Sequence, residues 1–479
     1  MESSWREVEF SKLCDIWRGG SPRPIHDWLA SSGIPWVKIS DASAAKSRFI
    51  DHTGSFIRPE GLRKSRPVIP GDLILSNSAT PGLPMFMGIE ACIHDGWLLL
   101  RNFRGIDKLF CYYLLLHERE RIVQKGSGTV FTNLKTEILK NHVVTIPPLN
   151  EQKAIAHVLG TLDDKIELNR KMNQTLEGIA RAIFKSWFVD FDPVRAKAAV
   201  RKQHPEWSNE QVSRVACLRQ AKRGRQACPS LKPEIAELFP DSFVDSELGE
   251  IPKGWRVRPI GDTVKVVGGG TPSTKNPLFW KNGTHAFCTP RDMASLESPV
   301  LLKTERHITD SGIKRVSSGS LPPGTVLMSS RAPIGYLAIS EIPVTVNQGI
   351  IAMICDRGLQ NYYVLHWARE NMDRILANAN GSTFQEISKR NFRPITALIP
   401  DEKLLRQFSL LYNSLHERIV ISLEENTVLI SIRDTLLPSL LSGKTRVSKV
   451  RGVTEEESNG KAASQESKSN IVTAKKRRA

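Results

Sequence analysis

The sequence predicts an α+β fold in which a mixed α/β domain followed by a long coiled-coil helix occurs twice. Two observations lead to this prediction. Short motifs recur in the same order in the two halves of the 479-residue chain. Each half also ends in a stretch whose apolar residues alternate in steps of three and four. We therefore expect two copies of one domain and two long helices.

The repeat is defined by turn motifs with equal spacing. Trp5 and Trp255 each precede a Gly-Gly-Ser/Thr-Pro turn by the same distance, at residues 19–22 and 269–272. The further matched pairs are 70–76 with 323–329, 112–113 with 362–363, 128–131 with 381–384, and 146–147 with 399–400. Between these motifs lie short β-branched and aromatic runs broken by Gly and Pro, which favour a mixed α/β domain.

A coiled-coil seam follows each Ile-Pro pair, and it predicts one helix over residues 155–187 and another over 408–440. The first helix would span roughly 50 Å, so two such helices can act as a ruler. Pro438 is expected to kink or end the second helix. The seam positions are Ile155, Leu159, Leu162, Ile166, Asn169 and Asn173 in the first helix, and Phe408, Tyr412, Leu415, Ile419, Ser422 and Asn426 in the second.

The polar seam positions coincide in the two helices, with Asn169 and Asn173 matching Ser422 and Asn426. Buried polar residues at such positions cost stability but fix the register and the partner of a coiled coil. The alternative is that they are exposed breaks in a surface helix.

Composition restricts the partners and the compartment. The chain has 67 Lys and Arg against 50 Asp and Glu, a net charge of +17, which favours nucleic acid or an anionic membrane surface as partner. The alternative is a basic protein with no such partner. The seven cysteines form no Cys-x-x-Cys pair, and no apolar stretch could cross a bilayer. We expect a soluble cytoplasmic protein.

The motifs divide the chain into consecutive segments. Residues 190–232 carry ten Lys and Arg against four Asp and Glu, which marks a basic connector, and the C-terminal residues are rich in Ser, Lys and Glu. The expected segments are a first domain (1–148), a central helical spacer (149–190), a basic connector (191–250), a second domain (251–401), a distal helical spacer (402–443) and a disordered basic tail (444–479).

Catalytic motifs are not evident in the sequence. Gly443-Lys444-Thr445 resembles the end of a phosphate-binding loop, but Pro438 stands where that motif requires glycine. The Pro-Pro pairs lack the context of an adenine methyltransferase motif, and no acidic pair with lysine at nuclease spacing follows Pro240-Asp241. His117-Glu118 and His416-Glu417 lack the second histidine of a zinc helix. We expect neither an enzyme nor a metal site.

Four stretches carry a resemblance to a known family. They are IPPLNEQKAIAHVLGTLDDKIELNR from Ile146, AIFKSWFVDFDPVRAKA from Ala182, LFPDSFVDSELGEIPKGW from Leu238 and LLPSLLSG from Leu436. With them, nearly the whole chain resembles the specificity (S) subunit of type I restriction-modification systems. The second copy departs from the pattern at IPDEKLLRQ from Ile399.

The resemblance implies two target-recognition domains, each reading one half of a bipartite site in double-stranded DNA. It implies two antiparallel helices that space the domains and dock methyltransferase (M) subunits, with restriction/motor (R) subunits joining that core. S-adenosylmethionine, ATP and Mg²⁺ would be used by those partners, and none would be bound by this chain. The membrane is not an expected partner.

The DNA-reading residues are expected on domain loops, where Lys and Arg hold phosphates and other side chains read base edges. Each candidate has an alternative role as a turn-capping or surface polar residue. The candidates are Ser76, Asn77, Ser78, Lys125, Ser127 and Thr129 in the first copy, and Ser329, Ser330, Arg331, Ser382 and Thr383 in the second.

Two other functions remain open at this point. A single-chain methyltransferase or nuclease would bind S-adenosylmethionine itself or carry its own metal, and a binding test with the purified chain discriminates it. A scaffold that uses its helices only to hold proteins together would not shift DNA in a gel. The DNA target sequence does not follow from the residues, because base choice depends on loop geometry and DNA shape.

Overall fold

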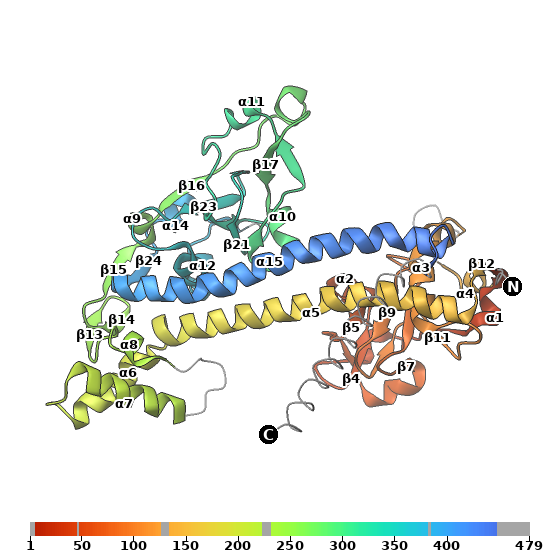
Figure 1. Ribbon diagram of the computed structural model, residues 1–479, viewed down its shortest axis with the longest axis horizontal. Coiled ribbons are helices and arrows are strands. Elements are labelled where there is room, and N and C mark those ends of the chain that lie inside the picture. Colours follow the sequence, from red (N-terminus) through yellow and green to blue (C-terminus); the bar gives the residue numbers. More distant parts are fainter. Residues whose placement is uncertain (1–4, 46, 126–133, 223–230, 382–384, 448–479) are drawn as a thin grey trace, which may run out of the picture. The chain divides into compact units, whose positions relative to one another are not determined.

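The computed structural model describes residues 5–45, 47–125, 134–222, 231–381 and 385–447. The chain forms two compact units (Figure 1): unit 1 comprises Met1–Leu168 and Glu425–Ala479, and unit 2 comprises Asn169–Glu424. Each unit holds one α/β domain and part of each long helix, α5 (Leu149–Phe188) and α15 (Glu402–Leu441).

The domain of unit 1 has a two-stranded ladder and two five-stranded sheets. The ladder pairs β1 (Arg6–Glu9) with β12 (Val143–Ile146). One sheet has the order β2 (Asp15–Arg18), β11 (Trp97–Arg101), β8 (Leu73–Ser76), β9 (Pro84–Met87) and β5 (Phe49–Ile50), and the other β3 (Leu29–Ala30), β6 (Phe56–Ile57), β4 (Ile34–Val37), β10 (Ala91–Ile93) and β7 (Arg66–Val68). The α-helices are α1 (Phe10–Leu13), α2 (Ile39–Ala44), α3 (Lys108–Gln124) and α4 (Thr136–Lys140).

The domain of unit 2 repeats this topology. The ladder pairs β15 (Arg256–Pro259) with β24 (Thr396–Ile399). The larger sheet has the equivalent order β16 (Lys265–Gly268), β23 (Ile350–Ile354), β20 (Val326–Ser330), β21 (Ile334–Ser340) and β18 (Val300–Leu301), and the smaller one β19 (Arg306–Ile308), β17 (His285–Cys288) and β22 (Val344–Val346). The α-helices are α9 (Ile260–Thr263), α10 (Pro290–Ala294), α11 (Asp310–Ile313), α12 (Asn361–Glu370), α13 (Met372–Ala377) and α14 (Lys389–Phe392). The predicted α+β fold with a repeated domain is confirmed.

The sheet that contains β8 in unit 1 and the equivalent sheet that contains β20 in unit 2 are each buried on both faces, which explains their continuous apolar strands. In β8, Leu73 and Leu75 join the core on one face while Ile74 joins the core on the other. In β20, the equivalent Val326 and Met328 join one core while Leu327 joins the other. Because successive side chains of a strand point to opposite faces, each sheet contributes to two hydrophobic cores.

The two long helices run antiparallel where they pack in unit 1. Asp163 of α5 accepts a hydrogen bond from Arg433 of α15 at 2.8 Å, and Lys165 lies 3.1 Å from Glu425, so the numbering rises along one helix as it falls along the other. Asn169, Asn173, Ser422 and Asn426 are 1–3% exposed, and the polar seam positions are therefore not surface breaks. The apolar seam positions in both helices are buried or half-buried.

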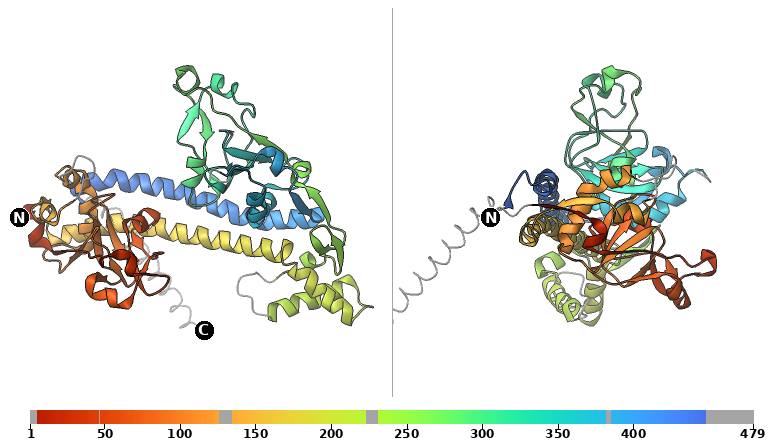
Figure 2. Two further views of the ribbon diagram at one scale, coloured as in Figure 1. Left: turned by 180° about the vertical axis from the view of Figure 1, so that it is seen from behind. Right: turned by 90° about the vertical axis from the view of Figure 1, so that its right-hand side faces the viewer.

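The connector is folded to a greater extent than its polar composition indicates. It contains α6 (Asp192–Gln203), α7 (Asn209–Lys222), α8 (Pro233–Ala236) and a hairpin of β13 (Phe243–Ser246) and β14 (Gly249–Pro252). Helices α6 and α7 lie side by side (Figures 1 and 2) around Val200, Val212 and Ala216. Lys197 is fully buried and donates hydrogen bonds to Asn209 Oδ1 and to the Ala236 and Phe239 carbonyls.

The end of α15 differs from the expectation at Pro438. The helix continues through this residue to Leu441, and Leu440 and Leu441 are buried in the unit 1 core, which offsets the hydrogen bond that proline cannot donate. Gly443 follows with φ +72°, so the phosphate-loop-like motif is the end of a helix. The expected disordered tail lies outside the described residues from 448 onward. Within the described residues, no helix is long and apolar enough to cross a membrane.

Candidate nucleic-acid interface

Ser76 and Ser329 occupy the same position in the two units, and both hydroxyls close a turn. Ser76 Oγ accepts a hydrogen bond from the Leu83 amide and donates one to the Thr80 carbonyl. Ser329 Oγ accepts one from the Tyr336 amide and donates one to the Pro333 carbonyl. Both serines are fully buried. In this structure both hydroxyls shape the loop.

Asn77 and Ser330, the next residues along the chain, connect three loops in each unit. The Asn77 amide donates to the Gly96 carbonyl, and the Asn77 carbonyl accepts from the Leu134 amide, both at 2.8 Å. In unit 2, Ser330 makes the same pair of bonds with Gly349 and Ile387, at 2.8 and 3.0 Å. The strand-end loops therefore contact both a second turn and the segment that follows α3 or α13.

The Gly-Gly-Ser/Thr-Pro turn packs against this second turn, and the packing explains its glycines. The Gly20 amide donates to the Ile93 carbonyl at 3.0 Å, and the Gly270 amide donates to the Val346 carbonyl at 3.1 Å. A Cβ atom on Gly19 would lie 2.1 Å from the His94 carbonyl oxygen, and one on Gly269 would lie 1.7 Å from that of Val346. No side chain fits at either position.

We call these elements the loop cluster: residues 18–23, 76–82 and 94–96 in unit 1, and residues 268–273, 329–335 and 347–349 in unit 2. In both clusters a side chain closes the turn at residues 94–96 or 347–349. His94 Nδ1 accepts from the Gly96 amide at 2.5 Å, and Asn347 Oδ1 accepts from the Gly349 amide at 2.9 Å. The two units build the same backbone with different side chains.

Backbone strain is present at the same place in both clusters. Ala79 has φ 57° and Ala332 has φ 54°, a left-handed conformation that costs a non-glycine residue roughly 1–2 kcal/mol. Both residues follow the strand-end serine by three positions. Strain of this kind is often held at functional sites, and its duplication supports a functional role for these loops.

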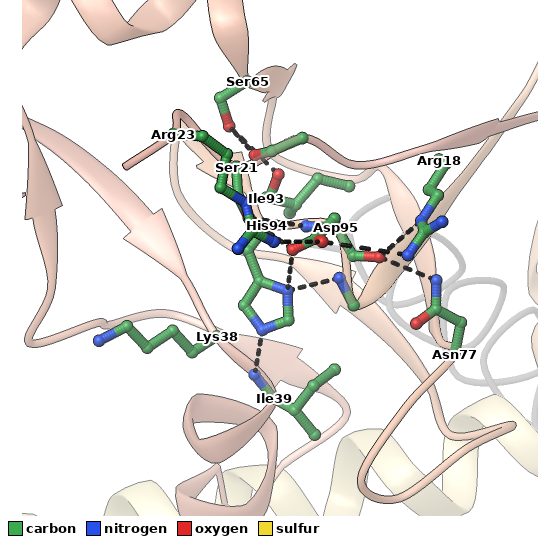
Figure 3. A network of polar contacts seen from close by, with 12 residues as sticks. Arg18, Ser21, Arg23, Lys38, Ile39, Ser65, Asn77, Ile93, His94 and Asp95 are labelled. Carbon is green, nitrogen blue, oxygen red and sulfur yellow. Dashed lines mark hydrogen bonds and ion pairs between the residues drawn. The ribbon is translucent and has the colours of Figure 1, made fainter. Parts of the chain in front are cut away.

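A charged network occupies the unit 1 cluster (Figure 3). Ser21 Oγ donates to Asp95 Oδ1 at 2.5 Å, and Arg23 Nη2 donates to Asp95 Oδ2 at 3.1 Å. Arg18 Nε donates to the Asp95 carbonyl at 3.0 Å, and Asn77 Nδ2 donates to the same carbonyl at 3.0 Å. Burial opposes ionisation of Asp95, but the Ser21 hydrogen bond and the Arg23 charge outweigh it and lower the pKa of this carboxyl.

The remaining sequence candidates are placed less centrally. Ser78 is half-buried, and Lys125 is exposed at the end of α3 with Nζ 3.1 Å from His142 Nδ1. Arg331 is partly exposed, and its Nη1 lies 3.7 Å from Glu386 Oε2. The candidates Ser127, Thr129, Ser382 and Thr383 lie outside the described residues. Among the described residues, no group of three or more His, Cys, Asp or Glu side chains is placed to hold a metal ion.

Sequence reasoning missed Arg18, Arg23 and Asp95, together with their counterparts at 268, 273 and 348. The sequence did contain a signal for the turn that holds Asp95. Gly96 and Gly349 are separated by the same number of residues as the matched Ser76 and Ser329. The turn that these glycines close is therefore part of the repeat.

The family of the chain is decided by comparison with known proteins. A family model described as the type I restriction modification DNA specificity domain matches residues 2–178 and 252–425, which together make up most of the sequence. The chain belongs to this family. It is a type I restriction-modification specificity subunit with two specificity domains, and the matched ranges contain both loop clusters.

Named relatives agree with this assignment. The specificity subunit is 27% identical to the type I restriction enzyme HindI specificity subunit of Haemophilus influenzae, over 92% of this chain and 100% of that protein. It is 33% identical to the MjaIX specificity subunit of Methanocaldococcus jannaschii over 39% of this chain and 44% of that protein. A crystal structure of the type I S subunit from M. genitalium has a TM-score of 0.52 at 14% identity, covering 92% and 96% of the two chains, and shows a shared fold.

Proposed function

We propose that this specificity subunit recognises a bipartite site in double-stranded DNA, with each loop cluster reading one half-site. The observation that carries the proposal is the duplication of the cluster within two specificity domains: the backbone is the same and the exposed side chains differ. A shared backbone gives two domains the same approach to the duplex, while different side chains give them different base preferences. The net charge of +17 supplies the attraction to phosphates.

The proposal is tested by selecting duplexes from a random library with the subunit assembled with its methyltransferase. We expect two short sequence blocks separated by a gap of fixed length and free sequence. Affinity for nonspecific DNA should also fall steeply with salt, because several phosphates release counterions. A single block, or no enrichment, contradicts bipartite recognition, and a salt-independent affinity contradicts the phosphate contacts.

We further propose that the long helices dock methyltransferase subunits, with restriction subunits joining that assembly in the cytoplasm. Leu411 of α15 is exposed, and so are four further apolar side chains of this helix: Leu410, Ile421, Val428 and Ile432. Their spacings of 11, 7 and 4 residues place them on one face of the helix. Scattered exposed apolar residues are ordinary, but apolar side chains that recur on one face of a helix favour a protein contact.

The docking proposal is tested by copurification with the methyltransferase subunit. Ile421→Asp and Val428→Asp should each reduce copurification strongly, whereas Leu218→Asp, on exposed Leu218 of α7, should not. Equal copurification of all three variants would contradict docking on this face. We propose that the chain itself is non-catalytic, and that S-adenosylmethionine, ATP and Mg²⁺ are bound and used by the partner subunits.

A further inference from the structure

The two loop clusters differ in side chains at several matched positions, and three of these positions belong to the Asp95 network of unit 1. Where unit 1 has Arg18, Arg23 and Asp95, unit 2 has Gly268, Ser273 and Gln348. The surrounding contacts are equivalent: Ser21 donates to Asp95 and Thr271 donates to Gln348, in each case from the hydroxyl to a side-chain oxygen at 2.5 Å. At these three positions, the two units therefore place different side chains on one scaffold.

Arg18 and Arg23 approach Asp95 from the two ends of the Gly-Gly turn and remain accessible to solvent. Their side chains are 63% and 73% exposed. Asp95 accepts from Nη2 of Arg23, and Nε of Arg18 bonds to the Asp95 backbone, so much of each guanidinium faces outward (Figure 3). A guanidinium held by a carboxylate loses less conformational freedom when it binds a ligand.

Stability alone is a weak reason for this arrangement. Exposed ion pairs contribute little to folding, and a carboxylate on a DNA-facing surface repels phosphates. A carboxylate there has a clear use if it orients arginines toward base edges. Arginine matches the O6 and N7 acceptors of guanine, and the amide of glutamine matches N6 and N7 of adenine in the major groove.

We propose that Arg18 and Arg23, positioned by Asp95, read guanine in the half-site of unit 1, and that Gln348 reads adenine in the half-site of unit 2. This inference rests on the proposed bipartite recognition. It assigns the difference between the two half-sites to three matched positions, and it makes Asp95 a positioning residue.

The test is the same library selection with the assembled complex. R23A should lose about tenfold or more of the preference for guanine at one position of one half-site, with the other half-site unchanged. R6A is the matched control. Arg6 is an exposed arginine of β1 in the same unit, and R6A removes the same positive charge as R23A. D95N should weaken the preference at the same base position as R23A, and it should add little to R23A in the double variant.

The half-site of unit 2 provides an independent test of the inference. Q348E removes the amide donor. It should shift one position of that half-site from adenine toward cytosine, because a carboxylate accepts a hydrogen bond from the cytosine amino group. The exchange variant G268R/S273R/Q348D should introduce a guanine preference there; a side chain at 268 displaces only the flexible end of Lys389.

The outcomes separate the inference from the function on which it rests. If R23A weakens all sequences equally, as R6A does, the arginines contact phosphate and the inference fails while bipartite recognition stands. If Q348E leaves its half-site unchanged, the assignment of Gln348 is wrong. If the wild-type complex selects no bipartite site, the proposed function fails and the inference fails with it.

Discussion

Tyr113 of α3 donates a hydrogen bond to Asp163 of α5, with 2.6 Å between the hydroxyl oxygen and Oδ2. The other carboxylate oxygen accepts from Arg433 of α15 at 2.8 Å, and Arg48 lies 3.8 Å from Oδ2. One carboxylate therefore connects the α/β domain of unit 1 to its portions of both long helices. In unit 2 the matched helix position is His416, whose Nε2 lies 2.7 Å from Glu341 Oε1. The two units thus attach their domains through different residues at the same helix position.

Asp163→Ala is expected to destabilise unit 1 by about 1–3 kcal/mol, because the Tyr113 hydroxyl loses its acceptor and Arg48 and Arg433 lose the more buried of their two carboxylate partners. The Asp163 side chain is 11% exposed. The neighbouring Asp164 is exposed and pairs with Arg48, so Asp164→Ala should cost under about 1 kcal/mol. Denaturant unfolding measures the loss of stability in both variants, and amide hydrogen exchange shows whether the loss falls in unit 1. Equal losses in the two variants would show that Asp163 is not the centre of the network.

His366 of α12 is expected to make unit 2 sensitive to acid. Its ring is buried against Phe184, neither ring nitrogen has a hydrogen-bond partner among the described residues, and desolvation lowers its pKa from 6.5 to about 3. The unfolded state therefore binds the proton first. The stabilisation is complete above about pH 6.5 and is lost as the pH falls from there toward 3, by up to about 1.4 kcal/mol per pH unit.

His366→Phe should remove this part of the pH dependence while keeping a ring in the core. His307→Phe is the control, since His307 is exposed on β19. Unfolding of the three proteins at pH 7.5, 6 and 5 provides the measurement. If His366→Phe retains the wild-type slope, another group is responsible for the loss in acid.

Lys197→Met should unfold the connector locally. Without the ammonium group, the Ala236 and Phe239 carbonyls and Asn209 Oδ1 each lose a donor, at a cost of about 1–3 kcal/mol for each group left buried and unpaired. Amide hydrogen exchange should accelerate in α6, α7 and α8 and remain unchanged in the β-sheets of both units. Lys202→Met, at an exposed residue of α6, is the control. Unchanged protection in the Lys197 variant would show that the apolar contacts of the connector suffice.

The sequence predicted those features of the fold that recur at a fixed spacing. The repeat, the long helices and the polar seam positions were all readable, because each occurs twice at a fixed offset. Convergence of loops leaves no such signal: Gly20, Asn77, Asp95 and Leu134 are distant in the sequence and meet only through the sheet. Ser76 was a candidate for reading bases, with turn capping as its alternative role, and the sequence does not distinguish the two roles. The helices of the connector were missed because fully buried Lys197 stands in the apolar face of α6.

The last prediction concerns helix length, and it rests on the proposal that α5 and α15 set the gap between half-sites. Seven residues are inserted after Leu168 in α5 and seven after Glu424 in α15, where the boundaries between the two units fall. One heptad keeps the seam in register and adds about 10 Å at about 1.5 Å per residue. That length is near three base pairs at about 3.4 Å each. Library selection should therefore return a longer gap.

Binding should also weaken, because three added base pairs turn the duplex by about 100° and the domains must twist to follow. A two-residue insertion at the same places is the control. It rotates the following part of the seam by about 200° and would expose Leu176, Ile183 and Trp187, so we expect misassembly. If the double-heptad variant folds, binds DNA and selects the wild-type gap, the helices do not measure the site, and the distance between half-sites must be set within the domains.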